Sequence, residues 1–387
     1  MTPGARIQAA IDLLDRIDAG EPAEKALTGW GRRSRFAGSG DRAAVRDHVF
    51  QALRCYRSYA CLGGAQTGRG RMIGALRATG LDPAEVFTGA GHAPALLTDT
   101  ELSAGTAPVG ADACDLNDWV LEEFRTSLGE GAEAAALALR TRAPVMLRVD
   151  LRRGTRDDAI GLLAKDDISA AVHPIATTAL CVTKGARRLA RSRAFLDGMV
   201  ELQDGSGQAA MQAINLDGGR SILDFCAGGG GKALALAARS DARIYAHDVD
   251  PSRMQDIPTR AARAGVQIEQ IATSALPRKA PFDIVLCDAP CSGSGTWRRT
   301  PEAKWRLTRE RLTALTKLQS QILPEAAALV APGGQLVYAT CSLLSTENED
   351  RIDAFLNAKS EWKLVHAQRF DVTDGGDGFF MAQMTRA

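Results

Sequence analysis

A carboxylate and two thiols follow the ends of predicted strands, where they could act together on one substrate. The apolar run Phe282–Cys287 is followed by Asp288 and Cys291, and the run Gln335–Ala339 is followed by Cys341. Cysteine is a strong nucleophile near neutral pH once its pKa is lowered. In an open α/β sheet, ligands bind outside the carboxyl ends of the strands. We therefore expect Asp288, Cys291 and Cys341 to converge at one edge of a sheet.

A glycine-rich loop follows another predicted strand, Ile222–Cys226. The loop Cys226-Ala227-Gly228-Gly229-Gly230-Gly231-Lys232 leads into a predicted helix, whose first N–H groups are available to a ligand. Asp248 ends the next strand, and a carboxylate there can accept hydrogen bonds from both ribose hydroxyls. Ala233 stands where a phosphate-binding P-loop has Ser or Thr. The pattern predicts a nucleoside-type cofactor, and a glycine turn without a ligand is the alternative.

Composition limits the remaining classes of function. The chain has 387 residues, a formal net charge of +1 and eight cysteines, none of them in a C-x-x-C pair. We expect reduced thiols and no metal site, because no second Cys or His pair has zinc spacing. We also expect no signal peptide and no membrane span, hence a cytoplasmic protein. Any nucleic-acid site must come from local basic patches. The oligomeric state cannot be inferred from the sequence.

Hydrophobic periodicity divides the chain into three parts. Residues 1–140 have helical spacing, with a basic stretch at Arg32 and Arg33. Residues 141–215 contain short strand-like and helical pieces and form a small α/β segment that we expect to contact RNA. Residues 216–387 alternate between strand and helix, which predicts a doubly wound, Rossmann-like parallel sheet. The predicted fold class is therefore α/β, preceded by an all-helical domain.

Several motifs resemble those of the RsmB/Sun group of RNA cytosine-5 methyltransferases. Asp288-Ala289-Pro290-Cys291-Ser292-Gly293-Ser294-Gly295 resembles their DAPCSGxG motif, and Thr340-Cys341-Ser342, with Glu347-Asn348-Glu349, resembles their TCS…ENE motif. The glycine loop resembles their CAAPGGK loop. The helical part, including Asp41-Arg42-Ala43-Ala44-Val45-Arg46, resembles a NusB-like RNA-binding module. The resemblance covers nearly the whole chain.

The resemblance implies a function and roles for individual residues. It implies S-adenosylmethionine-dependent methylation of carbon 5 of a cytosine in RNA, most simply ribosomal RNA. Cys341 would be the nucleophile that attacks carbon 6, and Cys291 would assist product release. Asp288 would contact the base and supply a proton, and Lys232 would support the site. The cofactor would be held by Cys226, Ala227, Gly228, Gly229, Gly230, Gly231, Lys232, Asp248, Arg253, Thr273 and Asp288.

Two departures from the family pattern concern the cofactor site. The family loop commonly has Ala-Pro where this chain has glycines around Gly228. After the third strand the family often has an acidic residue near the adenine, whereas this chain has Ala272-Thr273-Ser274. A hydroxyl or a backbone N–H of Thr273 would have to replace that acid.

RNA contacts are expected at Arg32, Arg33, Arg298, Arg299 and Lys304. The last three belong to a segment, Trp297 to Arg306, in which tryptophans alternate with basic residues. Aromatic and basic side chains suit unstacked bases and phosphates, and packing of the tryptophans against helices is the alternative. Three functions remain open: an RNA cytosine methyltransferase, a methyltransferase acting on tRNA or a non-RNA substrate, and an RNA-binding assembly factor without turnover.

Overall fold

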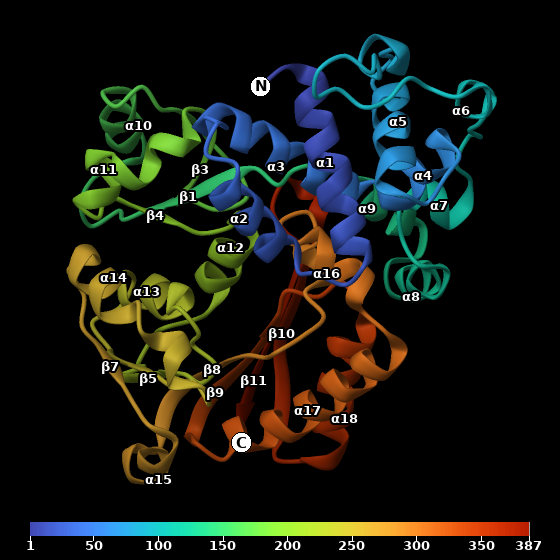
Figure 1. The fold of residues 1–387 in the computed structure, drawn as a ribbon. Coiled ribbons are helices and arrows are strands. Elements are labelled where there is room, and N and C mark those ends of the chain that lie inside the picture. Colours follow the sequence, from blue (N-terminus) through green and yellow to red (C-terminus); the bar gives the residue numbers. More distant parts are fainter. Residues whose placement is uncertain (387) are drawn as a thin grey trace. The chain divides into compact units, whose positions relative to one another are not determined.

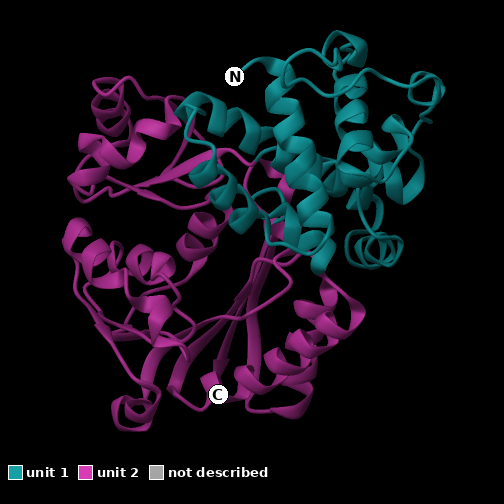
Figure 2. Cartoon of the chain, viewed as in Figure 1, with its two compact units in different colours: residues 1–142, 297–306 teal, residues 143–296, 307–387 magenta. Residues whose placement is uncertain are grey.

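The computed structural model describes residues 1–386, which form two compact units. Unit 1 comprises residues 1–142 together with 297–306, and unit 2 comprises residues 143–296 and 307–387 (Figure 2). The expected helical domain, 1–140, coincides with the main part of unit 1. The expected small segment, 141–215, and the expected methyltransferase domain, 216–387, lie together in unit 2, except for the segment 297–306.

Unit 1 is helical. A buried apolar cluster that includes Leu13, Leu14, Val49, Met72 and Phe87 forms its core. Its helices are α1 (Pro3–Asp18), α2 (Ala23–Arg33), α3 (Ser39–Arg54), α4 (Tyr56–Gly63), α5 (Gly68–Ala78), η1 (Pro83–Glu85), α6 (Asp99–Ser103), α7 (Gly110–Cys114), α8 (Asp118–Leu128), η2 (Gly129–Gly131), α9 (Ala132–Ala138) and α16 (Pro301–Arg306). Arg32 and Arg33 are the last two residues of α2.

The segment 297–306 packs inside unit 1. Trp297 is 1% exposed and stacks on Phe124 of α8, with ring centroids 5.9 Å apart. Lys304 Nζ donates to the carbonyl of Arg54 at 3.0 Å, and Trp305 Nε1 donates to the carbonyl of Leu53 at 2.7 Å. The expected range of the third domain is therefore wrong at this segment, because buried side chains and hydrogen bonds tie it to the helical unit.

Unit 2 begins with a small antiparallel sheet in the order β2-β3-β1-β4. Thr155 caps its first helix through a hydrogen bond from Asp158 N, which fixes the start of that helix after β1. Its core contains Leu147, Leu163 and Leu180. The elements are β1 (Val145–Val149), α10 (Arg156–Ala164), β2 (Ser169–Val172), β3 (Ala179–Lys184), η3 (Ala186–Arg191), α11 (Arg193–Leu196), β4 (Val200–Leu202) and α12 (Gly205–Ala213).

A seven-stranded sheet follows in the order β10-β11-β9-β8-β5-β6-β7 (Figure 1). The strands β9, β8, β5, β6 and β7 are parallel, and β11 and β10 are antiparallel to their neighbours. The strands are β5 (Ser221–Asp224), β6 (Arg243–Ala246), β7 (Ile268–Gln270), β8 (Phe282–Asp288), β9 (Val330–Thr340), β10 (Trp362–Phe370) and β11 (Phe379–Arg386). The Rossmann-like fold class predicted from the alternating pattern is confirmed.

Alternate residues of the strands enter apolar layers on opposite faces of the sheet. Leu223 of β5 packs in the cluster that holds Leu323 and Phe355, whereas Ile222 packs in the cluster that holds Met211 and Leu236. The helices of this part are α13 (Gly231–Ala237), η4 (Pro251–Met254), α14 (Ile257–Ala264), η5 (Thr273–Ala275), α15 (Leu276–Lys279), η6 (Ser294–Thr296), α17 (Arg309–Ala327), η7 (Ser345–Glu347), α18 (Glu349–Ala358) and η8 (Val372–Asp374). Helices on both faces leave the carboxyl edge of the parallel strands for ligands.

Candidate active site

The predicted catalytic and cofactor-binding residues follow neighbouring parallel strands. Asp288 ends β8 and Thr340 ends β9, and β5, β6 and β7 continue the sheet on the other side of β8. The glycine loop follows β5, and Asp248 follows β6. Because these strands run in the same direction, their following loops meet along one edge.

The two expected thiols are in contact. Cys291 Sγ and Cys341 Sγ lie 3.4 Å apart, and both side chains are partly buried. The hydrogen bond to Cys341 and burial raise the pKa of the Cys291 thiol well above its ordinary value. Either sulfur can donate to the other across this contact. The expected convergence of the two thiols is therefore present, and their roles remain a prediction.

Lys232, the last residue of the glycine loop, forms an ion pair with Asp288. Lys232 Nζ lies 2.5 Å from Asp288 Oδ2 and 5.2 Å from the ring centroid of Phe379. Burial alone would lower the pKa of Lys232, but the charge and hydrogen bond of Asp288 outweigh burial, and the charges of Asp224 and Cys341 add to them. The pKa of Lys232 is raised, so Lys232 keeps its positive charge beside Asp288.

A buried glutamate, to which the sequence pattern assigned no role, joins the two cysteine-bearing loops. Glu347 is fully buried and accepts hydrogen bonds from Ser292 N at 2.8 Å and from the hydroxyls of Ser292 and Ser342, each at 2.5 Å. Gln319 Nε2 also donates to it, at 3.1 Å. Ser292 follows Cys291 and Ser342 follows Cys341, so this one carboxylate fixes both thiols.

The glycine loop is shaped for a close-lying ligand and tied to Asp248. Gly228 N donates to Asp248 Oδ2 at 3.0 Å, and Arg253 pairs with the same oxygen at 3.0 Å. Gly230 has φ +76°, and a Cβ there would lie 2.7 Å from Ile257 Cγ1, so only glycine fits. Asp248 is 2% exposed, whereas Val249 beside it is 83% exposed. The glycine-loop backbone, the Asp248 carboxylate and the exposed Val249 side chain are groups that can contact a nucleoside cofactor.

Asp224 is a second residue that sequence reasoning missed. It ends β5, is 1% exposed, and accepts from Ala233 N at 3.1 Å through Oδ2, while its Oδ1 has no hydrogen-bond partner among the described residues. Burial and the nearby charge of Asp288 raise the pKa of Asp224 to about 7. Its position between a strand and the glycine loop was the signal in the sequence that could have singled it out.

Two further cofactor-site predictions have different surroundings. Thr273 follows β7 and is exposed, and its hydroxyl lies 2.9 Å from His247 Nε2. Cys226 is partly buried, and its hydrogen bond with Cys287, together with burial, raises the pKa of Cys287 well above its ordinary value. The structure thus brings Cys226 to a neighbouring buried thiol, whereas Thr273 belongs to a separate contact with His247.

The predicted RNA-binding residues divide into two groups. Arg298 is 4% and Lys304 1% exposed, and both lie inside unit 1. Burial lowers the pKa of Lys304 to about 8. The prediction that Arg298 and Lys304 meet RNA phosphates is therefore wrong for this structure, because the segment 297–306 packs inside unit 1 and buries both side chains. Arg32, Arg33 and Arg299 are exposed on unit 1.

Comparison with known proteins decides the family. A family model described as 16S rRNA methyltransferase RsmB/F matches residues 211–385, and a model described as its ferredoxin-like domain matches residues 116–187. The ribosomal RNA small subunit methyltransferase B of Xanthomonas campestris is 33% identical over 301 residues, which cover 72% of this chain and 68% of the relative. The chain belongs to the RsmB/F methyltransferase family. Family membership implies S-adenosylmethionine as the cofactor.

A second curated relative and a solved structure show how much of this chain is similar to known proteins. The ribosomal RNA small subunit methyltransferase B of Klebsiella pneumoniae is 34% identical over 284 residues, or 69% of this RsmB/F-family chain and 65% of the relative. The chain thus spans about two thirds of the length of these relatives. A crystal structure described as PH0851 shares the fold, with a TM-score of 0.77 and 24% identity over 99% of each chain.

Among residues 1–386 of this RsmB/F-family chain there is no group of three His, Cys, Asp or Glu side chains arranged to hold a metal ion. No helix in the same range is both long enough and apolar enough to cross a membrane.

Proposed function

We propose that this protein methylates carbon 5 of a cytosine in ribosomal RNA through a covalent bond to Cys341. The observation that carries the proposal is the pair of thiols at neighbouring strand ends, with Sγ atoms 3.4 Å apart. The ion pair between Lys232 and Asp288, at 2.5 Å, lies at the end of β8, the strand that Cys291 follows. A nucleophile, a proton donor and a second thiol are the groups that this reaction requires.

Cys341 begins the reaction as a thiolate. It adds to carbon 6 of the ring, so that an Sγ–C6 bond forms and the C5=C6 electron pair moves toward carbon 5. Asp288 contacts the ring at N3, and N3 takes a proton from the pair of Asp288 and Lys232. S-adenosylmethionine, when bound, would supply the methyl group for carbon 5 from its sulfonium centre and would leave as S-adenosylhomocysteine.

Cys291 completes the reaction by removing the proton from carbon 5. The C5=C6 bond then re-forms, the Sγ–C6 bond breaks, and N3 returns its proton to the Asp288 and Lys232 pair. Cys291 must be a thiolate for this step. Its pKa is raised first by the hydrogen bond to Cys341, and that cause disappears once Cys341 is bonded to carbon 6. Formation of the adduct therefore removes one cause of the raised pKa of Cys291, while burial remains.

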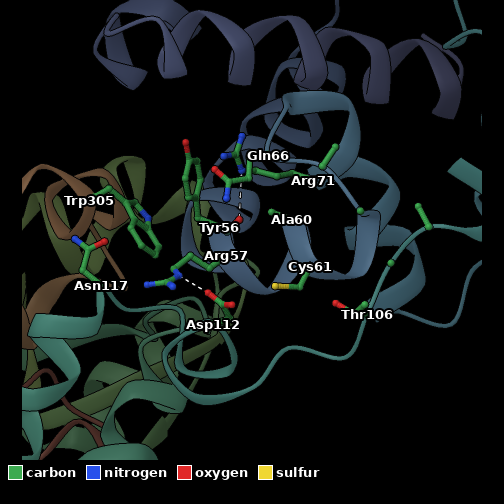
Figure 3. Close-up of a pocket in the computed structure, with 14 residues that line it drawn as sticks. Tyr56, Arg57, Ala60, Cys61, Gln66, Arg71, Thr106, Asp112, Asn117 and Trp305 are labelled. Atoms are coloured by element: carbon green, nitrogen blue, oxygen red, sulfur yellow. Dashed lines mark hydrogen bonds and ion pairs between the residues drawn. The ribbon is translucent and has the colours of Figure 1, made fainter. Parts of the chain in front are cut away.

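We further propose that unit 1 contributes to RNA binding. Arg32, Arg33 and Arg299 are exposed there. Trp305 and Tyr56, with ring centroids 5.0 Å apart, line a cavity of about 690 Å³, and Arg57 lines the same cavity (Figure 3). Aromatic faces and a guanidinium suit an unstacked base. The target cytosine must also leave its stack to reach Cys341.

The decisive experiment compares Cys341→Ala with the wild type in methyl transfer to ribosomal RNA. Bisulfite sequencing of the treated RNA then identifies any modified cytosine. Cys181→Ala, a change in β3, is the matched control and should retain activity. We expect Cys341→Ala to lose turnover while still binding S-adenosylhomocysteine. Equal turnover of Cys341→Ala and wild type would refute the covalent mechanism.

The same assay separates the two alternative functions. Methylation of tRNA or of a protein, with ribosomal RNA unmodified, would establish a different substrate for the same cofactor site. RNA binding without methyl transfer by the wild type would favour an assembly factor. The chain keeps the contact between the two thiols and the ion pair between Asp288 and Lys232. An assembly factor without turnover would need neither, so their presence argues against that function.

A further inference from the structure

The contact between His247 and Thr273 has no part in the chemistry described above. His247 follows β6 and is 3% exposed, and Thr273 is the exposed residue that follows the neighbouring strand β7. Ring nitrogen Nδ1 of His247 lies 2.7 Å from the carbonyl oxygen of Phe225, and Nε2 lies 2.9 Å from the Thr273 hydroxyl. The ring also stacks on Phe225, with centroids 4.9 Å apart.

With a neutral imidazole, these contacts fix the direction of the Thr273 hydroxyl. A carbonyl oxygen only accepts, so Nδ1 must carry the proton that it shares with Phe225. In a neutral imidazole the other nitrogen is then an acceptor. The Thr273 O–H consequently donates to His247 Nε2, and only the lone pairs of Thr273 Oγ1 remain for a ligand. The exposed hydroxyl of Thr273 therefore acts as an acceptor.

The position of this acceptor suits the base of a nucleoside. Asp248, the expected ribose contact, directly follows His247, and Val249 beside it is 83% exposed. An exposed valine next to a ribose-binding carboxylate offers an apolar face to a flat ring. The Thr273 acceptor stands on the next strand, β7, which pairs with β6. Adenine has one exocyclic amine, whose hydrogens require an acceptor at the edge of the ring.

We propose that His247 makes Thr273 an acceptor for the exocyclic amine of the cofactor's adenine. Thr273 is then a specificity-determining residue, and His247 is a positioning residue that acts through it. This inference rests on the proposed use of S-adenosylmethionine but not on the substrate or on the covalent step. It also explains how the chain can dispense with an acidic residue after the third strand.

The test measures equilibrium binding of S-adenosylhomocysteine and S-inosylhomocysteine, which has an oxygen in place of the amine. We expect the wild type to prefer the adenine ligand by about three- to tenfold, the effect of one neutral hydrogen bond. Thr273→Val should abolish that preference, and Thr273→Ser should keep it. His247→Asn retains a donor for Phe225 but cannot reach Thr273, so the preference should fall. Ser274→Ala is the matched control.

The ratio of the two affinities separates recognition from structure. If Thr273 had a purely structural role, Thr273→Val would lower the affinity for both ligands equally and leave the ratio of affinities unchanged. That result would overturn the inference. Failure of the wild type to bind S-adenosylhomocysteine would instead contradict the proposed function and, with it, this inference. Thermal unfolding of each variant identifies a loss of fold.

Discussion

Glu347 accepts hydrogen bonds from both the main-chain N–H and the hydroxyl of Ser292, the residue that follows Cys291. It also accepts from Ser342, the residue that follows Cys341. Hydrogen bonds to a charged acceptor are stronger than neutral ones and hold geometry more tightly. The 3.4 Å separation of the two Sγ atoms therefore depends on a carboxylate that has no chemical part in the reaction.

Replacement of this carboxylate should lower turnover without weakening cofactor binding. In Glu347→Gln the neutral amide cannot accept from all four donors, so the two loops lose their common anchor. We expect kcat for methyl transfer to fall about 10- to 100-fold, the effect of a misplacement of about 1 Å. The KM for S-adenosylmethionine should stay near the wild-type value.

Glu349→Gln is the matched control, because Glu349 lies in the same motif but pairs with Arg369. Both variants should be assayed well below their unfolding temperatures. A rise in KM without a fall in kcat for Glu347→Gln would show that Glu347 does not position the thiols.

Loss of the second thiol should trap the enzyme on its RNA. In Cys291→Ala, no base stands beside carbon 5, so the Sγ–C6 bond of Cys341 should persist after methyl transfer. We expect a protein–RNA adduct that survives denaturing gel electrophoresis and appears only when S-adenosylmethionine is present. The double variant with Cys341→Ala should form none. An adduct of equal amount in that double variant would contradict the assigned roles.

The positions of the main site residues followed from strand order. Asp288 and Cys291 were predicted to meet Cys341 because each follows an apolar strand, and β8 and β9 are indeed parallel neighbours. Hydrophobic runs identify strands well, and the carboxyl edge then brings their following loops together. Lys232 was placed near the site only by resemblance, and its ion pair with Asp288 gives that placement a physical basis.

Other features depend on contacts that a local pattern does not contain. The sequence Glu347-Asn348-Glu349 does not say which carboxylate points inward. Asn348, with φ −115° and ψ −101°, separates a fully buried acid from one that is 42% exposed in its side chain. Lys304 looked like a phosphate contact, but its partner is the carbonyl of Arg54, which is 250 residues away in sequence. Similarly, the strand predicted at Gln335–Ala339 begins earlier, at Val330, and its pairing with β8 contains an irregularity.

Stability should depend on pH through Asp224. The pKa of Asp224 in the folded protein is raised from 3.8 to about 7, chiefly by burial. Between these values the folded state binds a proton that the unfolded state does not bind, so stability falls as pH rises through this window. Asp224→Asn removes the titration. From pH 4 to pH 8 the free energy of unfolding of the wild type should fall relative to Asp224→Asn by about 2–4 kcal/mol.

Urea unfolding of both proteins at several pH values measures this difference. The comparison between the two proteins cancels the titration of groups that they share. A control pair, Asp241→Asn and wild type, should give parallel curves, because Asp241 is exposed in the loop before β6. Parallel curves for Asp224→Asn would mean that Asp224 is not protonated in the folded state near neutrality.

The segment 297–306 predicts separate effects of substitutions on stability and on RNA binding. Trp297 is 1% exposed and stacks on Phe124 in unit 1. Trp297→Ala should therefore destabilise the helical unit by about 3–5 kcal/mol, the usual cost of deleting a buried aromatic side chain. Hydrogen exchange should show the loss as faster exchange in α8.

Arg299→Ala provides the contrast, because Arg299 lies in the same segment but is exposed. It should leave exchange in α8 unchanged and weaken binding to ribosomal RNA, with a shallower dependence of affinity on salt because one phosphate contact is lost. If Arg299→Ala instead accelerated exchange in α8 and left the salt dependence unaltered, Arg299 would be part of the packing, as Arg298 and Lys304 are. The segment would then have no direct contact with RNA, and the exposed arginines of α2, Arg32 and Arg33, would be the next residues to test.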